Sequence, residues 1–121
     1  DLNDIFLACC EENLNNIKIE WSNKKSLCVV VCSNGYPDSF KKNVKIKRLD
    51  KINLDSDNLM FHAGTTKKNN EIYAIGGRVL NFVSISENFS TAKKNILNNL
   101  KELDWTDGFY RKDIGYKVTD S

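Results

Sequence analysis

The stretch IGGRVLNFVSI, residues 75–85, places two glycines and one arginine directly before a strongly apolar run. The apolar run predicts a strand that is covered on both sides, because its side chains fall on both faces of an extended chain. Leu80 and Phe82 belong to one face, and Val79, Val83 and Ile85 belong to the other. A strand gains no packing from glycine and loses backbone entropy, so Gly76 and Gly77 need another explanation.

Further strands are predicted on the amino-terminal side of this stretch. Leu59–Ala63 and Glu71–Ile75 are short and apolar, and the polar loop GTTKKNN joins them. With residues 78–85 they predict an antiparallel meander. Earlier in the chain, LCVVVC (Leu27–Cys32) predicts a central strand. The loop SNGYPDS (Ser33–Ser39) follows it, and its Asn-Gly and Tyr-Pro pairs are two turn signals in an irregular segment.

The two ends of the chain predict helices. Residues 1–14 carry an apolar stripe at helical spacing, and Ile17–Trp21 alternates apolar and polar residues as a half-buried strand does. Ser90 can cap a second helix. The apolar face of that helix comprises Ala92, Ile96, Leu97, Leu100 and Leu103. The expected architecture is therefore α+β, with a mostly antiparallel sheet and helices from both ends of the chain packed against it.

Composition limits the class of protein. The chain has 121 residues, which is enough for a single domain spanning residues 1–121. A net charge of +2 does not require a nucleic-acid partner. The longest apolar run, Leu27–Cys32, is too short to cross a membrane, so a cytoplasmic protein is expected. The chain starts at Asp1 inside a helical pattern, which suggests a piece of a longer protein.

Four cysteines are present, and we expect them to be buried free thiols. Cys28 and Cys32 have strand spacing on one face, whereas Cys9 and Cys10 fall in the helical stripe, where cysteine packs as a small hydrophobe. Two disulfides would suit a secreted protein, but no secretion signal is visible. The chain has one histidine and no C-x-x-C motif, so no zinc site is expected.

Four short strings contain the candidate functional residues, and each has a structural alternative. Gly76 and Gly77 can adopt positive φ and let a phosphate or carboxylate approach the backbone beside the guanidinium of Arg78, or the three residues can form a tight turn before a solvated arginine. His62 can titrate near neutral pH, or it can be a hydrogen-bonded residue at a strand end.

The other two strings leave the same choice open. GYP, Gly35–Pro37, can form a ligand edge or a rigid turn. FYRKDIG, Phe109–Gly115, supplies Arg111 but can equally be a loop pinned by its aromatic residues. No nucleophile-and-base arrangement, Walker loop or dinucleotide fingerprint is present. These residues alone do not form a catalytic centre.

The order of the four strings closely resembles a known family. SNGYPDSF, FHAGT, GGRVL and GFYRKDIG occur in the order and spacing of the carboxyl-terminal domain of phosphoribosylamine–glycine ligase, also called glycinamide ribonucleotide synthetase. That enzyme of purine biosynthesis has the ATP-grasp fold. The resemblance covers nearly the whole chain, and the opening DLNDIFLACCEENL resembles the helix that follows the ATP-grasp domain in the family.

The resemblance implies an ATP-dependent reaction. ATP phosphorylates the carboxylate of glycine, and the amine of 5-phosphoribosylamine attacks the acyl phosphate to give glycinamide ribonucleotide, ADP and phosphate. Mg²⁺ (or Mn²⁺) neutralises the triphosphate. The nucleotide and metal sites belong to the N-terminal and ATP-grasp domains, which this chain lacks. We therefore expect no catalytic residue, bound cofactor or turnover in this chain alone.

The resemblance also implies substrate-binding residues. Arg78 is expected to face the phosphate of phosphoribosylamine, and the backbone of Gly76 and Gly77 to lie beside it. The neighbouring edge comprises Gly35, Tyr36, Pro37 and His62, with Arg111 as a weaker candidate.

Two alternatives remain open at this point. The first is a free-standing, non-catalytic module that binds small anions or a protein partner. The second is single-stranded nucleic-acid binding by the Lys-rich segment Lys41–Lys51, although Asp50 and apolar residues interrupt it and a solvated strand face explains it better.

Overall fold

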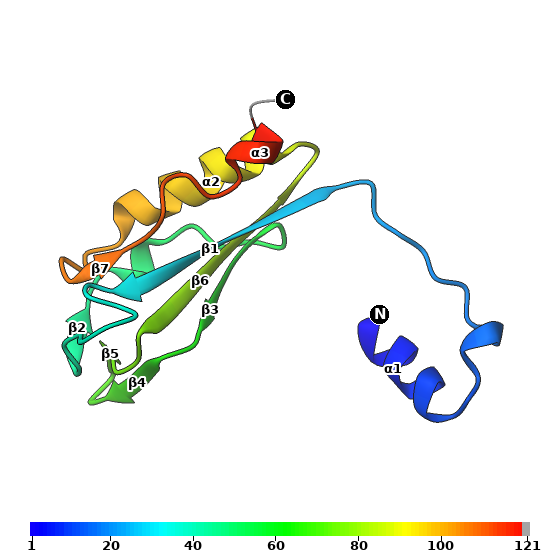
Figure 1. Ribbon diagram of the computed structural model, residues 1–121, viewed down its shortest axis with the longest axis horizontal. Coiled ribbons are helices and arrows are strands. Elements are labelled where there is room, and N and C mark those ends of the chain that lie inside the picture. Colours follow the sequence, from blue (N-terminus) through cyan, green and yellow to red (C-terminus); the bar gives the residue numbers. More distant parts are fainter. Residues whose placement is uncertain (120–121) are drawn as a thin grey trace.

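The computed structural model describes residues 1–119 and has the expected α+β architecture (Figure 1). In chain order the elements are α1 (Leu2–Cys10), η1 (Leu14–Asn16), β1 (Lys25–Ser33), β2 (Val44–Ile46), η2 (Leu49–Lys51), β3 (Asn58–His62), β4 (Thr65–Lys68), β5 (Glu71–Ala74), β6 (Arg78–Ser86), α2 (Phe89–Glu102), β7 (Gly108–Phe109) and α3 (Tyr116–Thr119). The strands form two antiparallel sheets, so the predicted fold class is confirmed.

The larger sheet has the strand order β3-β6-β1-β7, with β6 and β1 at its centre. β1 pairs with β6 over almost its whole length, from Lys25 opposite Ser86 to Cys32 opposite Arg78, and the register shifts at Val31/Cys32. This bulge lies at the end of β1 from which the loop beginning with Ser33 departs. The predicted central strand Leu27–Cys32 is therefore confirmed.

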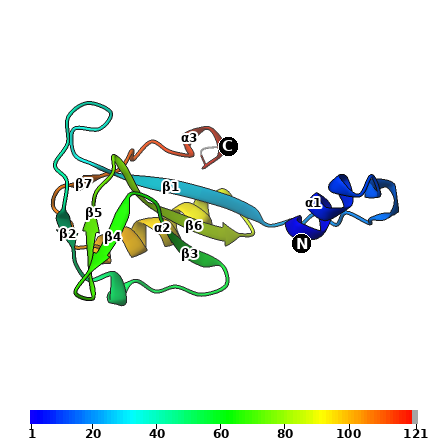
Figure 2. The ribbon, with the colours of Figure 1, turned by 90° about the horizontal axis from the view of Figure 1, so that it is seen from below.

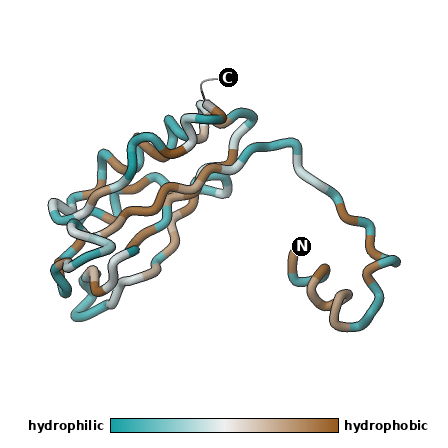
Figure 3. The backbone as a smooth tube through the Cα atoms, in the orientation of Figure 1, coloured by the Kyte–Doolittle hydropathy of each residue, from teal (hydrophilic) through white to brown (hydrophobic). Residues whose placement is uncertain are grey.

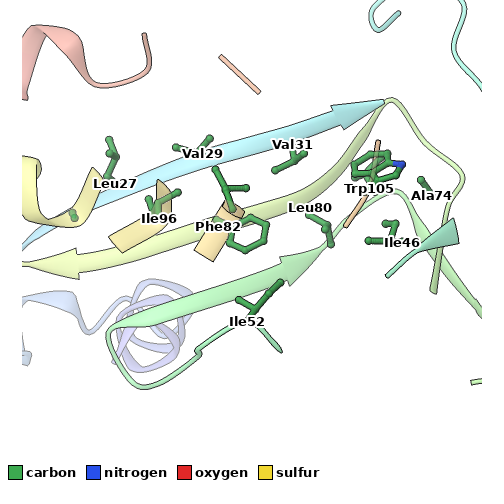
Figure 4. Packing of buried hydrophobic residues seen from close by; sticks show 13 residues of the cluster. Leu27, Val29, Val31, Ile46, Ile52, Ala74, Leu80, Phe82, Ile96 and Trp105 are labelled. Atoms are coloured by element: carbon green, nitrogen blue, oxygen red, sulfur yellow. The ribbon is translucent and has the colours of Figure 1, made fainter. Parts of the chain in front are cut away.

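One face of this sheet forms the core with α2 (Figure 4). Alternate residues of β1 are buried, and Leu80 and Phe82 of β6 are almost fully inaccessible to solvent. From α2, Ile96 packs into the same cluster. Trp105 extends the cluster towards Ile46, which belongs to the smaller sheet. Burial of this aliphatic and aromatic surface is the main stabilising term for the domain.

The smaller sheet has the strand order β2-β5-β4 and corrects the predicted meander. Residues 65–68, which were expected to form a loop, make strand β4. β3 pairs directly with β6, whereas β5 pairs with β2 and β4 in the other sheet. The meander prediction was wrong because adjacent short strands carry no local signal that tells which partner each one takes.

Helix α2 has the predicted apolar face but a different amino-terminal cap. Ala92, Ile96 and Leu100 are its buried residues. The N-cap is Asn88, not Ser90, and its side chain accepts a hydrogen bond from the Thr91 backbone N–H at 2.8 Å. Asparagine and serine are both strongly preferred N-cap residues, so the sequence alone did not distinguish Asn88 from Ser90 as the cap.

The amino-terminal arm, residues 1–24, differs most from expectation. Figures 1 and 2 show α1 set apart from the sheets, not packed against them. The predicted strand Ile17–Trp21 is an extended segment without a strand partner, and the Trp21 side chain is 87% exposed. Figure 3 shows hydrophobic stretches at several places along the arm, between hydrophilic ones. The arm has the alternation of a strand, but none of the described residues pairs with it.

The cysteines are free, but the prediction that all of them are buried was wrong. Cys9, Cys10 and Cys28 are exposed, and Cys32 is half-buried. Cys28 and Cys32 do share one face of β1, but that face is opposite to α2. Strand spacing predicted their common face correctly and could not tell whether that face is covered.

The Lys-rich segment behaves as the predicted solvated strand face. Ile46 of β2 is buried, while Lys45 and Lys47 on either side of it are exposed, and Lys45 pairs with Glu71. Among residues 1–119, no helix combines the length and apolar character that spanning a bilayer requires.

Candidate functional site

The four strings named above meet at one end of the two sheets. Ser33 donates its backbone N–H to the Gly77 carbonyl at 2.8 Å, and Gly64 donates to the Arg78 carbonyl at 3.0 Å. Asn34 donates to the Asp107 carbonyl at 2.7 Å. β7, which opens the fourth string, pairs with the last residues of β1. Backbone hydrogen bonds thus connect segments that lie far apart in the sequence.

The turn at Gly35 requires glycine. Its φ of +96° lies in the left-handed region, and a Cβ there would stand 2.2 Å from the Ser39 carbonyl oxygen. The turn continues through a cis peptide bond between Tyr36 and Pro37. It directs the Tyr36 ring against Gly77, where an added Cβ would lie 2.1 Å from Cδ2 of the ring. The loop after β1 and the double glycine are therefore in direct contact.

The double glycine does not adopt the positive φ that its sequence suggested. Among the described residues, the glycines with positive φ are Gly35 and Gly115, not Gly76 or Gly77. Gly76 instead lies against Gly64, with a Cβ on Gly76 only 2.9 Å from the Gly64 Cα. The two glycines are present because neighbouring loops pass too close for a side chain. The approach that they permit is between parts of the protein itself.

Ser33 holds the double glycine in place. It is 1% exposed, and its hydroxyl donates a hydrogen bond to the Gly76 carbonyl at 2.8 Å. Its backbone N–H donates to the next carbonyl, that of Gly77. Sequence reasoning did not single out Ser33 or Gly64. The one feature of the sequence that could have identified them is their position, Ser33 at the start of SNGYP and Gly64 inside FHAGT.

Arg78 is the exposed cation of this junction. It begins β6 directly after Gly77, and its guanidinium makes no hydrogen bond or ion pair with any other residue in 1–119. Its Cα is paired with that of Cys32. Burial raises the pKa of the Cys32 thiol, and the positive charge of Arg78 opposes part of that rise, so the two side chains lie near each other. Arg78 is thus held by its backbone and free at its charged end.

The side chains of His62 and Arg111 bond to other partners than the loop after β1 and the double glycine. His62 ends β3 beside Ala63 and Gly64, and its Nδ1 lies 3.1 Å from the Thr65 hydroxyl, at hydrogen-bond distance. Arg111 forms a bidentate pair with Asp113, donating from Nε at 3.1 Å and from a terminal nitrogen at 2.6 Å. This pair lowers the pKa of the Asp113 carboxyl. Arg111 therefore has less unsatisfied hydrogen-bonding capacity than Arg78.

An apolar hollow of about 320 Å³ joins Arg111 to the loop after β1. Tyr36 and Pro37 line one part of it, and Arg111 lines another. Cys28, Val30 and Cys32 of β1 contribute to the same hollow. The structure thus gathers six of the eight candidate residues into one contact network: Gly35, Tyr36, Pro37, Gly76, Gly77 and Arg78. Of the other two, Arg111 lies across the hollow and His62 lies beside Gly64.

The arrangement has the chemistry that suits an anion. A free guanidinium on a rigid backbone suits a phosphate or carboxylate, which it can contact through two parallel N–H groups. Within residues 1–119, no three His, Cys, Asp or Glu side chains lie close enough to hold a metal ion. What the junction offers among its described residues is a positive charge on a fixed backbone.

The fold and this junction define the chain as an α+β domain with an exposed arginine, Arg78, at the edge where the four strings meet. Residues 26–117 match the family model described as phosphoribosylglycinamide synthetase, C domain. The chain belongs to that family, as the order of its four strings predicted.

Curated relatives agree with this assignment. The chain is 40% identical over 116 residues to a phosphoribosylamine–glycine ligase of Fusobacterium nucleatum, covering 95% of this chain and 27% of the relative. It is 43% identical over 119 residues to a bifunctional purine biosynthetic protein of Dictyostelium discoideum, covering 98% of this chain and 15% of the relative. The chain thus spans about a quarter, or less, of the length of these relatives.

A solved structure supports the fold. The crystal structure of a phosphoribosylamine–glycine ligase from Thermotoga maritima superimposes with a TM-score of 0.69 at 26% sequence identity. The similarity covers 91% of this chain and 27% of that one.

Proposed function

We propose that this chain is the carboxyl-terminal domain of a phosphoribosylamine–glycine ligase, an ATP-dependent enzyme of purine biosynthesis. The complete ligase joins glycine to 5-phosphoribosylamine and converts ATP to ADP and phosphate. Family membership and the names of the relatives support this proposal. The observation that carries it for this chain is the free guanidinium of Arg78, which lies where the four family-like strings meet.

The role proposed for the domain is to position a substrate. The N–H groups of Arg78 bind the phosphate of phosphoribosylamine, while the network of Ser33, Gly76 and Gly77 fixes the direction from which the arginine reaches it. Gly35, Tyr36, Pro37 and His62 form the neighbouring edge, with Arg111 at its margin. The proposed ATP and Mg²⁺ (or Mn²⁺) sites belong to the N-terminal and ATP-grasp domains.

The proposed location is the cytoplasm, with no membrane or nucleic-acid partner. One plant relative, from Arabidopsis thaliana, is named as chloroplastic, so location is not uniform in the family.

Turnover by two purified proteins tests the proposal. The complete ligase containing this sequence is expected to form glycinamide ribonucleotide from glycine, phosphoribosylamine and ATP. The 121-residue chain is expected to be folded by circular dichroism but to show no turnover and no ATP binding. Turnover by the 121-residue chain would contradict its role as a dependent domain. A folded complete protein without ligase turnover would contradict the ligase assignment.

A further inference from the structure

The turn at residues 33–36 contains an asparagine followed by a glycine. Asn34 and Gly35 are both exposed, where the loop after β1 leaves the larger sheet beside β7 (Figure 1). They form the one Asn-Gly pair in the sequence. Asparagine is a thermally labile residue, because the peptide nitrogen that follows it can attack its side-chain amide. Glycine has no Cβ to hinder that attack, so the sequence of this turn favours a spontaneous covalent change.

The hydrogen bonds of the turn leave both reacting groups free. The Tyr36 N–H closes the turn by donating to the Ser33 carbonyl at 3.0 Å, so Asn34 and Gly35 occupy the two central positions. The φ of Gly35, +96°, is that of the third position of a type II turn, in which the central peptide points away from the closing hydrogen bond. Within residues 1–119, neither the Gly35 N–H nor the Asn34 side-chain amide bonds to another residue.

A second pair in the chain, Asp107 and Gly108, can form the same cyclic imide but is held by the fold. The Gly108 N–H donates to the Trp105 carbonyl at 3.0 Å. A Cβ on Gly108 would lie 2.4 Å from Cε3 of the Trp105 ring, so this peptide is closely packed. One carboxylate oxygen of Asp107 is inaccessible to solvent. The structure therefore separates two pairs that have similar sequences.

We infer that Asn34 is a site of spontaneous deamidation and that its isoaspartate product disables the edge that carries Arg78. The deprotonated nitrogen of Gly35 attacks the side-chain carbonyl carbon of Asn34. A C–N bond forms, the bond to the amide nitrogen breaks, and ammonia leaves with the proton that the Gly35 nitrogen gave up. Water then adds to one of the two carbonyl carbons of the succinimide ring. The ring C–N bond opens to aspartate or isoaspartate, with no change of oxidation state.

Isoaspartate changes the turn in two ways. The main chain now runs through the former side chain, which adds one bond, about 1.5 Å, between Ser33 and Tyr36. Both residues contact the double glycine, Ser33 through its hydrogen bond to the Gly76 carbonyl and Tyr36 through its ring against Gly77. The longer turn cannot keep both contacts as they are. In addition, a carboxylate that is ionised at neutral pH appears on an edge proposed to bind phosphate.

The effect on activity rests on the proposed function, whereas the modification itself does not. Arg78 follows Gly77 directly, so a displacement of Gly77 redirects the guanidinium. A displacement of about 1 Å at a positioning group can lower the use of a substrate by a large factor. The deamidated ligase is therefore expected to bind phosphoribosylamine less well.

Peptide mass mapping of the complete ligase that contains this sequence measures the modification. Deamidation raises the mass of the Asn34 peptide by about 1 Da, because a hydroxyl group replaces the amide NH₂. An isoaspartate methyltransferase with a labelled methyl donor then identifies the isoaspartate. The rates at mildly alkaline pH are compared between the native protein and the protein unfolded in guanidinium chloride.

Folding is expected to slow the two pairs by different factors. For Asn34 the native and unfolded rates are expected to agree within about tenfold, because an exposed turn opens at little cost. Asp107 is expected to react at least about a hundredfold more slowly in the native protein, because the Gly108 nitrogen is released only by local opening. A rate at Asn34 that folding lowers by more than about tenfold overturns the inference.

Kinetics of the modified ligase test the effect on the site. Ion-exchange chromatography isolates the form that carries one more negative charge. Its KM for phosphoribosylamine is expected to be at least about tenfold higher than that of unmodified ligase, with little change in KM for ATP. Asn34→Asp adds the charge without the extra backbone bond, so a smaller rise is expected. Asn34→Gln would need a larger ring, so its initial KM is expected to persist through the same incubation.

The modification and the proposed function can fail separately. If Asn34 is converted to isoaspartate but KM for phosphoribosylamine stays unchanged, the disabling effect is wrong. If Asn34→Asp raises KM as much as the isoaspartate form does, the charge is the cause and the lengthened turn is not. A complete protein without turnover removes the ligase assignment, and the mass measurement still decides whether Asn34 is the modification site.

Discussion

The Tyr36 ring lies directly against the backbone of Gly77, where a Cβ atom would stand 2.1 Å from Cδ2 of that ring. This contact joins the loop after β1 to the segment that carries Arg78. The double glycine thus has a structural reason, close passage of two loops, that also serves the proposed site. The sequence left a turn and a ligand edge as alternatives, and the close passage of the two loops is compatible with the ligand edge that we propose.

Gly77→Ala is expected to destabilise the domain by about 1–3 kcal/mol, because the added methyl group overlaps the Tyr36 ring. Urea unfolding of the 121-residue chain measures the change. Tyr36→Ala removes the overlapping ring, so the penalty of Gly77→Ala is expected to be smaller in that background. Equal penalties in both backgrounds would show that the ring is not the cause.

Gly64→Ala is expected to cost more than Gly77→Ala. A Cβ on Gly64 would lie 2.6 Å from the Arg78 carbonyl oxygen and 2.7 Å from the Gly76 Cα, both of which are backbone atoms. Backbone yields less readily than a side chain, so Tyr36→Ala is expected to give no relief here. The same unfolding measurement checks the order, and a Gly64→Ala chain as stable as Gly77→Ala would refute it.

Much of the fold follows from local pattern. The run Leu27–Cys32, the apolar face of α2 and the strand that begins at Arg78 were predicted correctly because each is long or strongly apolar. The pairing of the strands was not predicted correctly, since β3 and β5 are both short and apolar yet join different sheets. The strand predicted at Ile17–Trp21 in the amino-terminal arm was also wrong. Alternation of apolar and polar residues leads to a strand only where a partner strand is present to pair with it.

The candidate site was predicted as four strings but not as a network. Resemblance to the family identified the strings, and the structure brings most of their residues together. Ser33 and Gly64 were missed because their roles depend on a hydrogen bond and a contact between segments distant in the sequence. The positive φ expected for the double glycine was wrong for the same reason, since close passage of a neighbouring loop leaves no local signal.

Ser33→Ala is expected to destabilise the domain by about 1–3 kcal/mol, because it leaves the half-buried Gly76 carbonyl without its hydroxyl partner. Ser26→Ala, at an exposed serine of the same strand, is the control and is expected to change stability by less than about 0.5 kcal/mol. Thermal unfolding of both variants checks the difference. Similar values for the two would mean that the hydroxyl of Ser33 does not hold the double glycine.

The turn before β3 is expected to make stability depend on pH. Hydrogen bonds from the Asn58 side chain, and next from the Asp57 backbone N–H, lower the pKa of the Asp55 carboxyl below its usual value of 3.8. A lowered pKa in the folded state means that the stabilisation is complete above the unfolded value and is lost as pH falls through the folded one. Asp55→Asn keeps an oxygen acceptor without the charge.

The melting temperature of wild type is therefore expected to fall more steeply than that of Asp55→Asn between about pH 5 and about pH 2. Thermal scans at fixed ionic strength measure both profiles. Parallel profiles would show that Asp55 has nearly the same pKa in the folded and unfolded states.

Arg78→Ala in the complete ligase is expected to raise KM for phosphoribosylamine about tenfold or more, the effect of losing a charge-assisted hydrogen bond, with little change in KM for ATP. Arg78→Lys keeps the charge but not the two parallel N–H groups, so an intermediate KM is expected. Arg111→Ala is the comparison, because Arg111 already binds Asp113 and should matter less. Steady-state kinetics with each substrate varied in turn measures these effects. Equal changes in KM for both substrates would indicate a general disturbance of the site. A larger change in KM for Arg111→Ala than for Arg78→Ala would mean that the phosphate binds at Arg111, on the other side of the hollow.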